Sequence, residues 1–276
     1  MFNYIHQLYY TFLNKIRRKK RIKNSKLIPK QKNNYLNYSS EKIFDPIIFT
    51  PKFIFEEVKQ PIYNTEIKKI LHHQQDEPYL KFVSKYYEKI SLKHKKHSSY
   101  VDLVKILHVV SKLIKPENYL EIGVRRGRSI SIVAKNSPYC ELYAFDMWIQ
   151  NYAGVKNPGP KLVKKELKKV NHKGKIHFFD GKSQKTIPNF KKNNPKVFFD
   201  LICIDGDHSF YGAKKDLTSL IEMLKIGGFL VFDDTNSFEH PFLKDLWFNV
   251  VKKRDDFITC EFNELGLGVS IATRIY

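Results

Sequence analysis

Several features are scarce in this chain of 276 residues, and each scarcity excludes a class of protein. Only three cysteines occur, at positions 140, 203 and 260, and none forms a CxxC pair. This argues against a disulfide framework or a thiolate zinc site and favours a reducing compartment. No apolar run approaches the roughly 20 residues that span a bilayer. The amino terminus lacks the basic start and small-residue cleavage site of a secretory signal. We therefore expect a cytoplasmic protein.

Acidic residues are also scarce. The chain has 28 Asp and Glu against 49 Lys and Arg, a net charge of +21. Residues 1–40 contain ten Lys or Arg and no acid, and Glu41 is the first. Such an excess can attract nucleic acid, anionic lipid or acidic substrates. Composition is the rival explanation, because the whole chain is rich in Lys, Asn, Ile, Phe and Tyr.

The basic lead, residues 1–40, begins with an apolar pattern of helical spacing. Phe2, Ile5, Tyr9, Phe12 and Ile16 recur at steps of three and four, and the run IRRKKRIKNSK follows. An aromatic stripe beside a polybasic run can rest on an anionic membrane surface, so residues 1–26 are a candidate for peripheral membrane contact. The alternatives are a helix packed on the rest of the chain, or a tail.

The rest of the chain divides at about residue 115. Residues 41–115 read as a helical extension or lid, with helices near 78–91 and 99–115. From residue 116 strands and helices alternate, which predicts an α/β fold with a doubly wound, mostly parallel sheet and a terminal antiparallel strand pair. The predicted strands are 119–122, 142–145, 175–179, 199–204, 229–232, 257–262 and 266–273, and the predicted helices are 128–134, 161–170, 211–224 and 242–251.

Acidic side chains stand at the ends of four of these strands. In a doubly wound sheet, ligands bind outside the carboxyl ends of the strands. We therefore expect these side chains to converge on one edge. The acidic residues are Glu121, Asp146, Asp205 with Asp207, and Asp233 with Asp234, and His208 follows Asp207 directly.

The segment YLEIGVRRGRSI places Glu121, Gly123 and Gly127 in the spacing E-x-G-x-x-x-G. It lacks the middle glycine of the nicotinamide fingerprint. It resembles instead the first motif of class I S-adenosylmethionine (SAM) methyltransferases, in which glycine lets the backbone approach the cofactor and a carboxylate faces its cationic part. By the same logic Asp146, at the end of the next strand, takes the ribose hydroxyls. A tight turn without a ligand is the alternative.

Further segments resemble the metal-dependent small-molecule branch of that family, which includes catechol, caffeoyl-coenzyme A, macrolide and aminocoumarin sugar O-methyltransferases. The segment DGKSQKTIP resembles the adenine segment G-x-S-Q, which implies cofactor contacts from Gly181, Ser183 and Gln184. Ser129 matches the serine that holds the methionine carboxylate. LICIDGDHSFYGAKKDL and IGGFLVFDDT complete the resemblance, which covers residues 116–276 and implies that Asp205 also lies against the cofactor.

The resemblance assigns Asp205, Asp233 and Asp234 as ligands of Mg²⁺ or Mn²⁺, for which carboxylate oxygens are suitable donors. Helix capping and backbone hydrogen bonds are the alternative use of these carboxylates, and metal-free catalysis is another. His208 is the predicted general base, and Asp207 is its rival.

We expect a SAM-dependent enzyme that methylates a hydroxyl of a small or sugar-containing molecule. One alternative is a nucleic-acid methyltransferase acting on RNA, which the charge favours. DNA is not expected, because IDGDHS stands where amino-methylating DNA enzymes carry a Pro-Pro-aromatic segment. The other alternative is a non-catalytic protein that binds SAM or associates with a membrane. The sequence makes no prediction of oligomeric state.

Overall fold

The computed structural model describes residues 36–38, 41–43, 47–72, 78–93 and 100–275. The predicted membrane-contacting helix in residues 1–26 lies outside this part of the chain. Within the described residues, no helix combines the length and apolar character needed to cross a bilayer.

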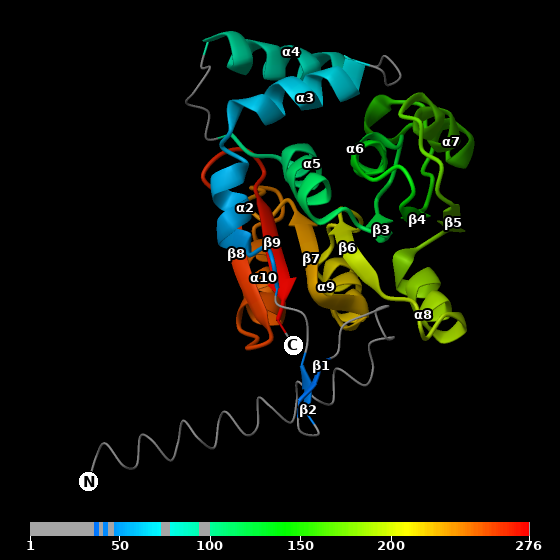
Figure 1. Ribbon diagram of the computed structural model, residues 1–276. Coiled ribbons are helices and arrows are strands. Elements are labelled where there is room, and N and C mark those ends of the chain that lie inside the picture. Colours follow the sequence, from blue (N-terminus) through cyan, green and yellow to red (C-terminus); the bar gives the residue numbers. More distant parts are fainter. Residues whose placement is uncertain (1–35, 39–40, 44–46, 73–77, 94–99, 276) are drawn as a thin grey trace.

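The centre of the molecule is a seven-stranded sheet in the order β5-β4-β3-β6-β7-β9-β8 (Figure 1). Strands β3 to β7 are mutually parallel, and β9 runs antiparallel to both β7 and β8. The prediction of a doubly wound sheet with a terminal antiparallel pair is confirmed. The strands are β3 Asn118–Ile122, β4 Glu141–Asp146, β5 Ile176–Asp180, β6 Phe199–Ile204, β7 Leu224–Asp233, β8 Phe257–Phe262 and β9 Val269–Arg274.

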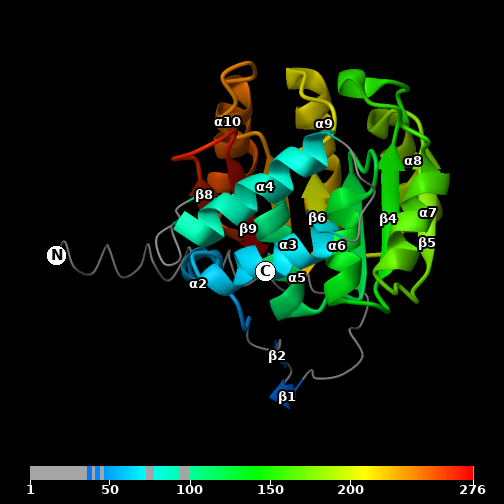
Figure 2. The same ribbon diagram turned by 90° about the horizontal axis from the view of Figure 1, so that it is seen from above.

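Alternate residues of each strand enter two separate cores, one on each face of the sheet. Tyr119 of β3 and Cys203 of β6 lie in the first core, whereas Leu120 and Ile202 lie in the second. The first core is covered by α5 Leu103–Ile114, α6 Arg128–Asn136 and α7 Pro160–Lys169. The second is covered by α8 Ser183–Asn193, α9 Phe210–Leu220 and α10 Phe242–Trp247. Figure 2 shows the two helical layers from above.

The amino-terminal extension contains a short hairpin, β1 Leu36–Tyr38 with β2 Glu41–Ile43, followed by α2 Pro51–Glu57, α3 Pro61–His72 and α4 Pro78–Lys93. Figure 1 shows α3 and α4 beyond the carboxyl ends of the parallel strands. The sequence predicted α4 and α5 but missed α2 and α3. Pro51 and Pro61 are the first residues of α2 and α3, a position where proline fits because no amide hydrogen is needed.

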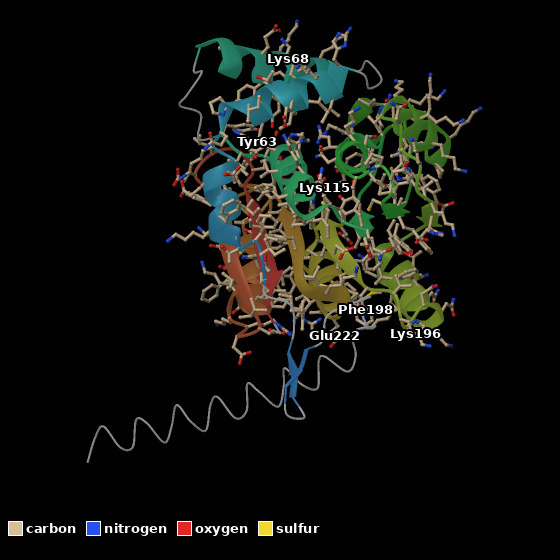
Figure 3. All side chains as sticks on the ribbon, in the orientation of Figure 1. Tyr63, Lys68, Lys115, Lys196, Phe198 and Glu222 are labelled. Carbon is tan, nitrogen blue, oxygen red and sulfur yellow. The ribbon has the colours of Figure 1, made fainter. Side chains whose placement is uncertain are left out.

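A cluster of polar interactions around Glu66 connects helix α3 to α5. Its carboxylate accepts hydrogen bonds from Lys112 Nζ at 2.6 Å and pairs with the Nε2 atom of buried His108 at 2.8 Å. Figure 3 labels Tyr63 and Lys68 on the same helix, and Lys196, Phe198 and Glu222 at the opposite, amino-terminal edge of the sheet. The extension therefore sits over the edge where the predicted site residues lie.

The predicted boundary between the helix at 211–224 and the strand that follows it is wrong. The helix expected over 211–224 ends at Leu220, a 3₁₀ turn follows, and β7 already begins at Leu224. Gly227 and Gly228 therefore lie inside β7 and do not end a helix. Gly227 has a positive φ of 78°, and the pairing of β7 with β6 shifts register next to Phe199. A bulge of this kind hides the start of a strand, because it interrupts the apolar run that predicts one.

Candidate active site

The predicted site residues meet at one edge of the sheet. The parallel strands β3, β4, β6 and β7 all end there, because neighbouring parallel strands share a direction. The loops that follow them carry the glycine turn, Asp146, the Asp205–His208 segment and the Asp233–Asp234 pair. The side chains form two groups. Those predicted to bind the cofactor lie mainly around β3 to β5, and the remaining carboxylates and the histidine lie around β6 and β7.

The backbone conformation and the close packing of the turn after β3 explain its two glycines. Gly123 has φ of 92°, and a Cβ atom there would lie 1.6 Å from the carbonyl oxygen of Asp205. Gly127 has φ of 83° and precedes α6, and a Cβ atom there would lie 3.3 Å from Val163. The first glycine thus allows the loop after β3 to touch the loop after β6.

Glu121 is fully buried within β3. The Tyr119 hydroxyl donates to it at 2.6 Å, and the Ser129 hydroxyl, at the start of α6, also donates to it. Burial raises the pKa of Glu121 to about 8 in spite of these hydrogen bonds, and Asp205 and Asp146 contribute to the rise. The raised pKa favours the neutral form of this carboxyl group, and a cationic ligand next to it would favour the ionised form.

Asp146, at the end of β4, forms hydrogen bonds to the loop after β3 and to the loop after β4. Its carboxylate accepts the backbone N–H of Arg125 and the backbone N–H of Trp148, each at 2.6 Å. Burial raises the pKa of Asp146, whereas these hydrogen bonds lower it. Each carboxylate oxygen keeps a further lone pair, so the group retains the capacity to accept ribose hydroxyls. The sequence did not single out Trp148, whose indole N–H donates to Asp180 at 2.6 Å.

Ser183 and Gln184 start α8, just after Gly181, which has φ of 120°. The Ser183 hydroxyl donates to Asp216 at 3.0 Å, and the Gln184 amide donates to Asp207 at 3.3 Å. Both side chains thus connect α8 to the region after β6. The sequence analysis missed Asp216, which is 1% exposed. An acidic residue on the apolar face of a predicted helix, here between Ala213 and Leu217 of α9, is the sequence feature that indicates it.

His208 lies between two carboxylates. Its Nε2 atom is 3.5 Å from Asp205 Oδ1, and its Nδ1 atom is 3.4 Å from Asp234 Oδ2. Asp205 raises the pKa of His208, burial opposes the rise, and Asp234 adds to it. The ring of His240, which the sequence analysis did not consider, has its centroid 5.4 Å from that of His208.

Asp207 has a different environment, at the entrance to α9. Its side chain is exposed and accepts the backbone N–H of Ser209 at 2.9 Å. A Cβ atom on Gly212 would lie 2.0 Å from an oxygen of Asp207, so this glycine makes room for the carboxylate. Of the two candidate bases, His208 is the one whose ring nitrogens lie within 3.5 Å of Asp205 and Asp234.

Asp233 and Asp234 end β7, and Asp234 adopts a positive φ of 60°. Burial raises the pKa of Asp233 well above its usual range, and the charges of Asp205 and Asp234 raise it further. Burial likewise raises the pKa of Asp234, whereas His208 lowers it. Three carboxylates therefore lie within electrostatic reach of one another. Among the described residues, however, no three His, Cys, Asp or Glu side chains are arranged as they stand to hold a metal ion.

Comparison with known proteins shows which proteins this arrangement resembles. Residues 120–235 match the family model described as a methyltransferase domain. Caffeoyl-CoA O-methyltransferase 1 of Eucalyptus globulus is 28% identical over 130 residues, which are 47% of this chain and 49% of that protein. The match thus spans about half the length of the curated relative.

Two solved structures share the fold. The O-methyltransferase TomG of Streptomyces achromogenes, in complex with SAM, aligns with a TM-score of 0.51 at 16% identity, over 68% of this chain and 87% of that chain. An O-methyltransferase of Bacillus cereus, in complex with SAH, aligns with a TM-score of 0.50 at 14% identity, over 68% and 88%. These two structures show the fold alone, whereas the family match and the curated relative support the resemblance to SAM-dependent O-methyltransferases that the motifs indicate.

Proposed function

We propose that this protein is a SAM-dependent O-methyltransferase that acts on a small hydroxylated or sugar-containing molecule. The observation that carries the proposal is the convergence of the glycine turn, Asp146 and the Asp205–His208–Asp234 cluster on one edge of a methyltransferase-like sheet. SAM would supply an electrophilic methyl group: the acceptor oxygen would bond to the methyl carbon as the carbon–sulfur bond breaks, S-adenosylhomocysteine would leave, and no covalent enzyme intermediate would be needed.

Most of the residues that would bind the cofactor lie around β3 to β5. Asp146 would accept the ribose hydroxyls, and Gly123 and Gly127 would let the backbone pass close to the cofactor. Glu121 and Ser129 would face its methionine part, while Gly181, Ser183 and Gln184 would border the adenine and Asp205 would close the site from β6. Glu121 supports this assignment, because a buried carboxyl group with a raised pKa gains most from a cationic ligand.

His208 would act as the general base that removes the proton of the acceptor hydroxyl. It lies between Asp205 and Asp234, both of which stabilise its protonated form. A general base needs such stabilisation as it takes the hydroxyl proton. Asp207 remains the rival, but its carboxylate is engaged at the start of α9. If His208→Ala keeps near-normal turnover while Asp207→Ala abolishes it, the assignment is wrong.

The donor set of Asp205, Asp233 and Asp234 fits a hard divalent cation such as Mg²⁺ or Mn²⁺. The raised pKa values of Asp233 and Asp234 support this use, because a cation would relieve the repulsion among the carboxylates. These side chains would have to turn toward a common centre. A bound ion would orient the acceptor hydroxyl and make it more acidic. Asp205→Ala should abolish any stimulation of turnover by Mg²⁺, and unchanged stimulation would reject the assignment.

The first test is thermal unfolding with SAM, S-adenosylhomocysteine (SAH) or NAD, each with Mg²⁺ or with EDTA. A ligand that binds the native state must raise the midpoint. The proposal requires a rise with SAM or SAH but not with NAD, and the metal assignment requires Mg²⁺ to enlarge it. A folded sample that responds to neither SAM nor SAH would reject the proposed function.

A further inference from the structure

The end of the molecule formed by the edge strand β5 and the flanking helices α7 and α8 is strongly basic. Both ribbon views show these three elements together at one end of the sheet (Figures 1 and 2). The basic end, residues 156–196, contains 13 lysines and only two acidic residues. Residues 199–275, by contrast, contain eight Lys or Arg and 13 Asp or Glu. A lysine-rich composition of the whole chain therefore does not explain the basic end, because such a bias would affect both segments.

The outer face of α7 consists of lysine. All five lysines of this helix are exposed, and they recur at steps of one, three and four residues along a single face. They are Lys161, Lys164, Lys165, Lys168 and Lys169. Among the described residues, only Lys169 of this set pairs with a carboxylate, that of buried Glu166 at 2.9 Å. The other four ammonium groups can therefore bind an external anion without breaking an ion pair.

The placement of these lysines is unfavourable for the helices that carry them. Lys161 lies in the first turn of α7 and Lys185 in the first turn of α8, and neither turn contains an acidic residue. A cation in the first turn opposes the helix dipole, and like charges three or four residues apart repel each other. Helix stability therefore does not account for this lysine pattern, whereas a bound polyanion would compensate the repulsion.

An exposed aromatic ring extends the basic end at the carboxyl terminus of α7. Tyr139, in the loop between α6 and β4, is 74% exposed, and its hydroxyl accepts a hydrogen bond from Lys173 Nζ at 3.5 Å. The backbone N–H of Lys173 donates to the carbonyl oxygen of Pro138 at 2.7 Å, which holds the loop after α7 against the Tyr139 loop. A tyrosine ring among lysines is a surface on which a nucleobase can stack while the ammonium groups contact phosphates.

The composition and the extent of the basic end distinguish between two anionic partners, a membrane and a nucleic acid. Every exposed residue of α7 is a lysine, so this helix has no apolar side chain to insert into a bilayer, as interfacial helices do. The lysines also continue past the sheet edge to α8, on the opposite face of the sheet. A flexible chain can follow such a surface, whereas a flat bilayer touches only part of it. Both features favour a nucleic acid strand.

We infer that the basic end binds the backbone of single-stranded nucleic acid, with the lysines of α7 on phosphates and Tyr139 stacked on a base. All the cations of this segment are lysines, which make point contacts with phosphates, and none is an arginine suited to bidentate recognition of a base. Binding should accordingly be insensitive to sequence and depend steeply on salt. The inference does not rest on the proposed function, because neither the α7 lysines nor Tyr139 belongs to the candidate active site.

The test is fluorescence anisotropy of the full chain with a labelled oligouridylate of about 20 nucleotides, over a range of KCl concentrations. Each phosphate contact with a single strand contributes about −0.7 to the slope of log K against log salt. Combined replacement of Lys161, Lys164, Lys165 and Lys168 by Gln should therefore weaken binding at least tenfold and make the slope shallower by about 2 to 3. Tyr139→Ala should weaken binding at least fivefold at an unchanged slope, and Tyr139→Phe, which keeps the ring, should bind as the parent does.

The matched control replaces Lys214, Lys215, Lys244 and Lys253 by Gln, which removes the same charge from exposed positions on α9, α10 and the turn that follows. It should weaken binding less than threefold. Residues 1–40 are identical in all variants, so their charge does not contribute to the differences. The urea midpoint of the α7 variant should equal or exceed that of the parent, because the substitutions remove repulsion, and this shows that the variant folds.

Three results would overturn the inference. The first is a parent protein that does not bind the oligouridylate. The second is equal weakening by the α7 set and the control set, because net charge alone would then explain binding. The third concerns vesicles of phosphatidylcholine and phosphatidylserine in a sedimentation assay. If the α7 variant loses vesicle binding and keeps oligouridylate binding, the partner of the basic end is a membrane.

Discussion

Asp216 offers the most direct quantitative test of the structure. It is 1% exposed on α9, and it accepts a hydrogen bond from Ser183. Its other oxygen, Oδ1, is buried and has no hydrogen-bond partner among the described residues. Burial raises its pKa from 3.8 to about 7, and the charge of Asp207 contributes. The substitution Asp216→Asn keeps a carbonyl acceptor for Ser183 and removes the charge. We expect it to abolish one component of the pH dependence of stability.

The sign and size follow from proton linkage. As the pH rises above 3.8, the unfolded chain loses the proton of Asp216 first, while the native state keeps it until about pH 7. The native state thus binds more protons in this window, and stability falls as the pH rises. Between pH 5 and pH 8 the window covers about two pH units, and each unit is worth about 1.4 kcal/mol. The parent should therefore lose about 2 to 3 kcal/mol relative to Asp216→Asn.

The measurement is urea unfolding of both proteins at pH 5, 6, 7 and 8. The difference in free energy of unfolding should grow in favour of the variant and level off above the native pKa. The exposed Asp245 on α10 gives the control Asp245→Asn, for which the difference should stay constant. A difference for Asp216→Asn that is the same at pH 5 and pH 8 would show that the carboxyl group is ionised in the native state, and its burial on α9 would then be wrong.

Three other substitutions test contacts elsewhere by the same unfolding measurement. Gly123→Ala should cost about 2 to 5 kcal/mol, since it combines a positive φ with a Cβ atom 1.6 Å from the Asp205 carbonyl oxygen; a cost below 1 kcal/mol would mean that β3 and β6 are not in such close contact. Glu66→Ala should cost about 1 to 3 kcal/mol, because buried His108 loses its carboxylate partner; a neutral result would contradict the docking of α3 on α5. Asp200→Ala, which removes the carboxylate that accepts Lys225 Nζ at 2.7 Å, should cost about 2 to 4 kcal/mol and leave SAH affinity unchanged, because Asp200 lies at the amino-terminal edge of the sheet. Weaker SAH binding in that variant would place the cofactor elsewhere.

The parallel part of the fold was predictable because its signals are local. Each parallel strand except β7 is a short apolar run bounded by turn residues, and the run length separates it from a helix. The amino-terminal extension was only partly predictable: the helix that begins at Pro78 was expected, whereas the two that begin at Pro51 and Pro61 were not. Only the packing of Ile54 and Ile67 in the first core distinguishes a proline that starts a helix here from one that interrupts it.

The residue types of the candidate site were predictable, but their contacts were not. Strand ends place Asp146, Asp205 and Asp234 on one edge whatever the details of the loops. That Ser183 pairs with Asp216, however, depends on how α8 packs against α9, and no local pattern encodes that packing. Asp216 was missed for this reason, although a charged residue on an apolar helix face always requires a partner or a shifted pKa.

The residues of the candidate site and those of a cavity beside it come from different parts of the chain. The residues proposed to bind the cofactor and move the proton all lie within the segment that matches the family model. Phe82, Tyr86 and Tyr100, which line the cavity beside Asp233 and Asp234, come from α4 and residue 100, before that segment begins. A substitution in α4 can therefore change this cavity while the strand ends stay the same. Substitutions at Phe82 and Tyr86 should accordingly leave SAH affinity intact, whereas substitutions at Asp146 should weaken it.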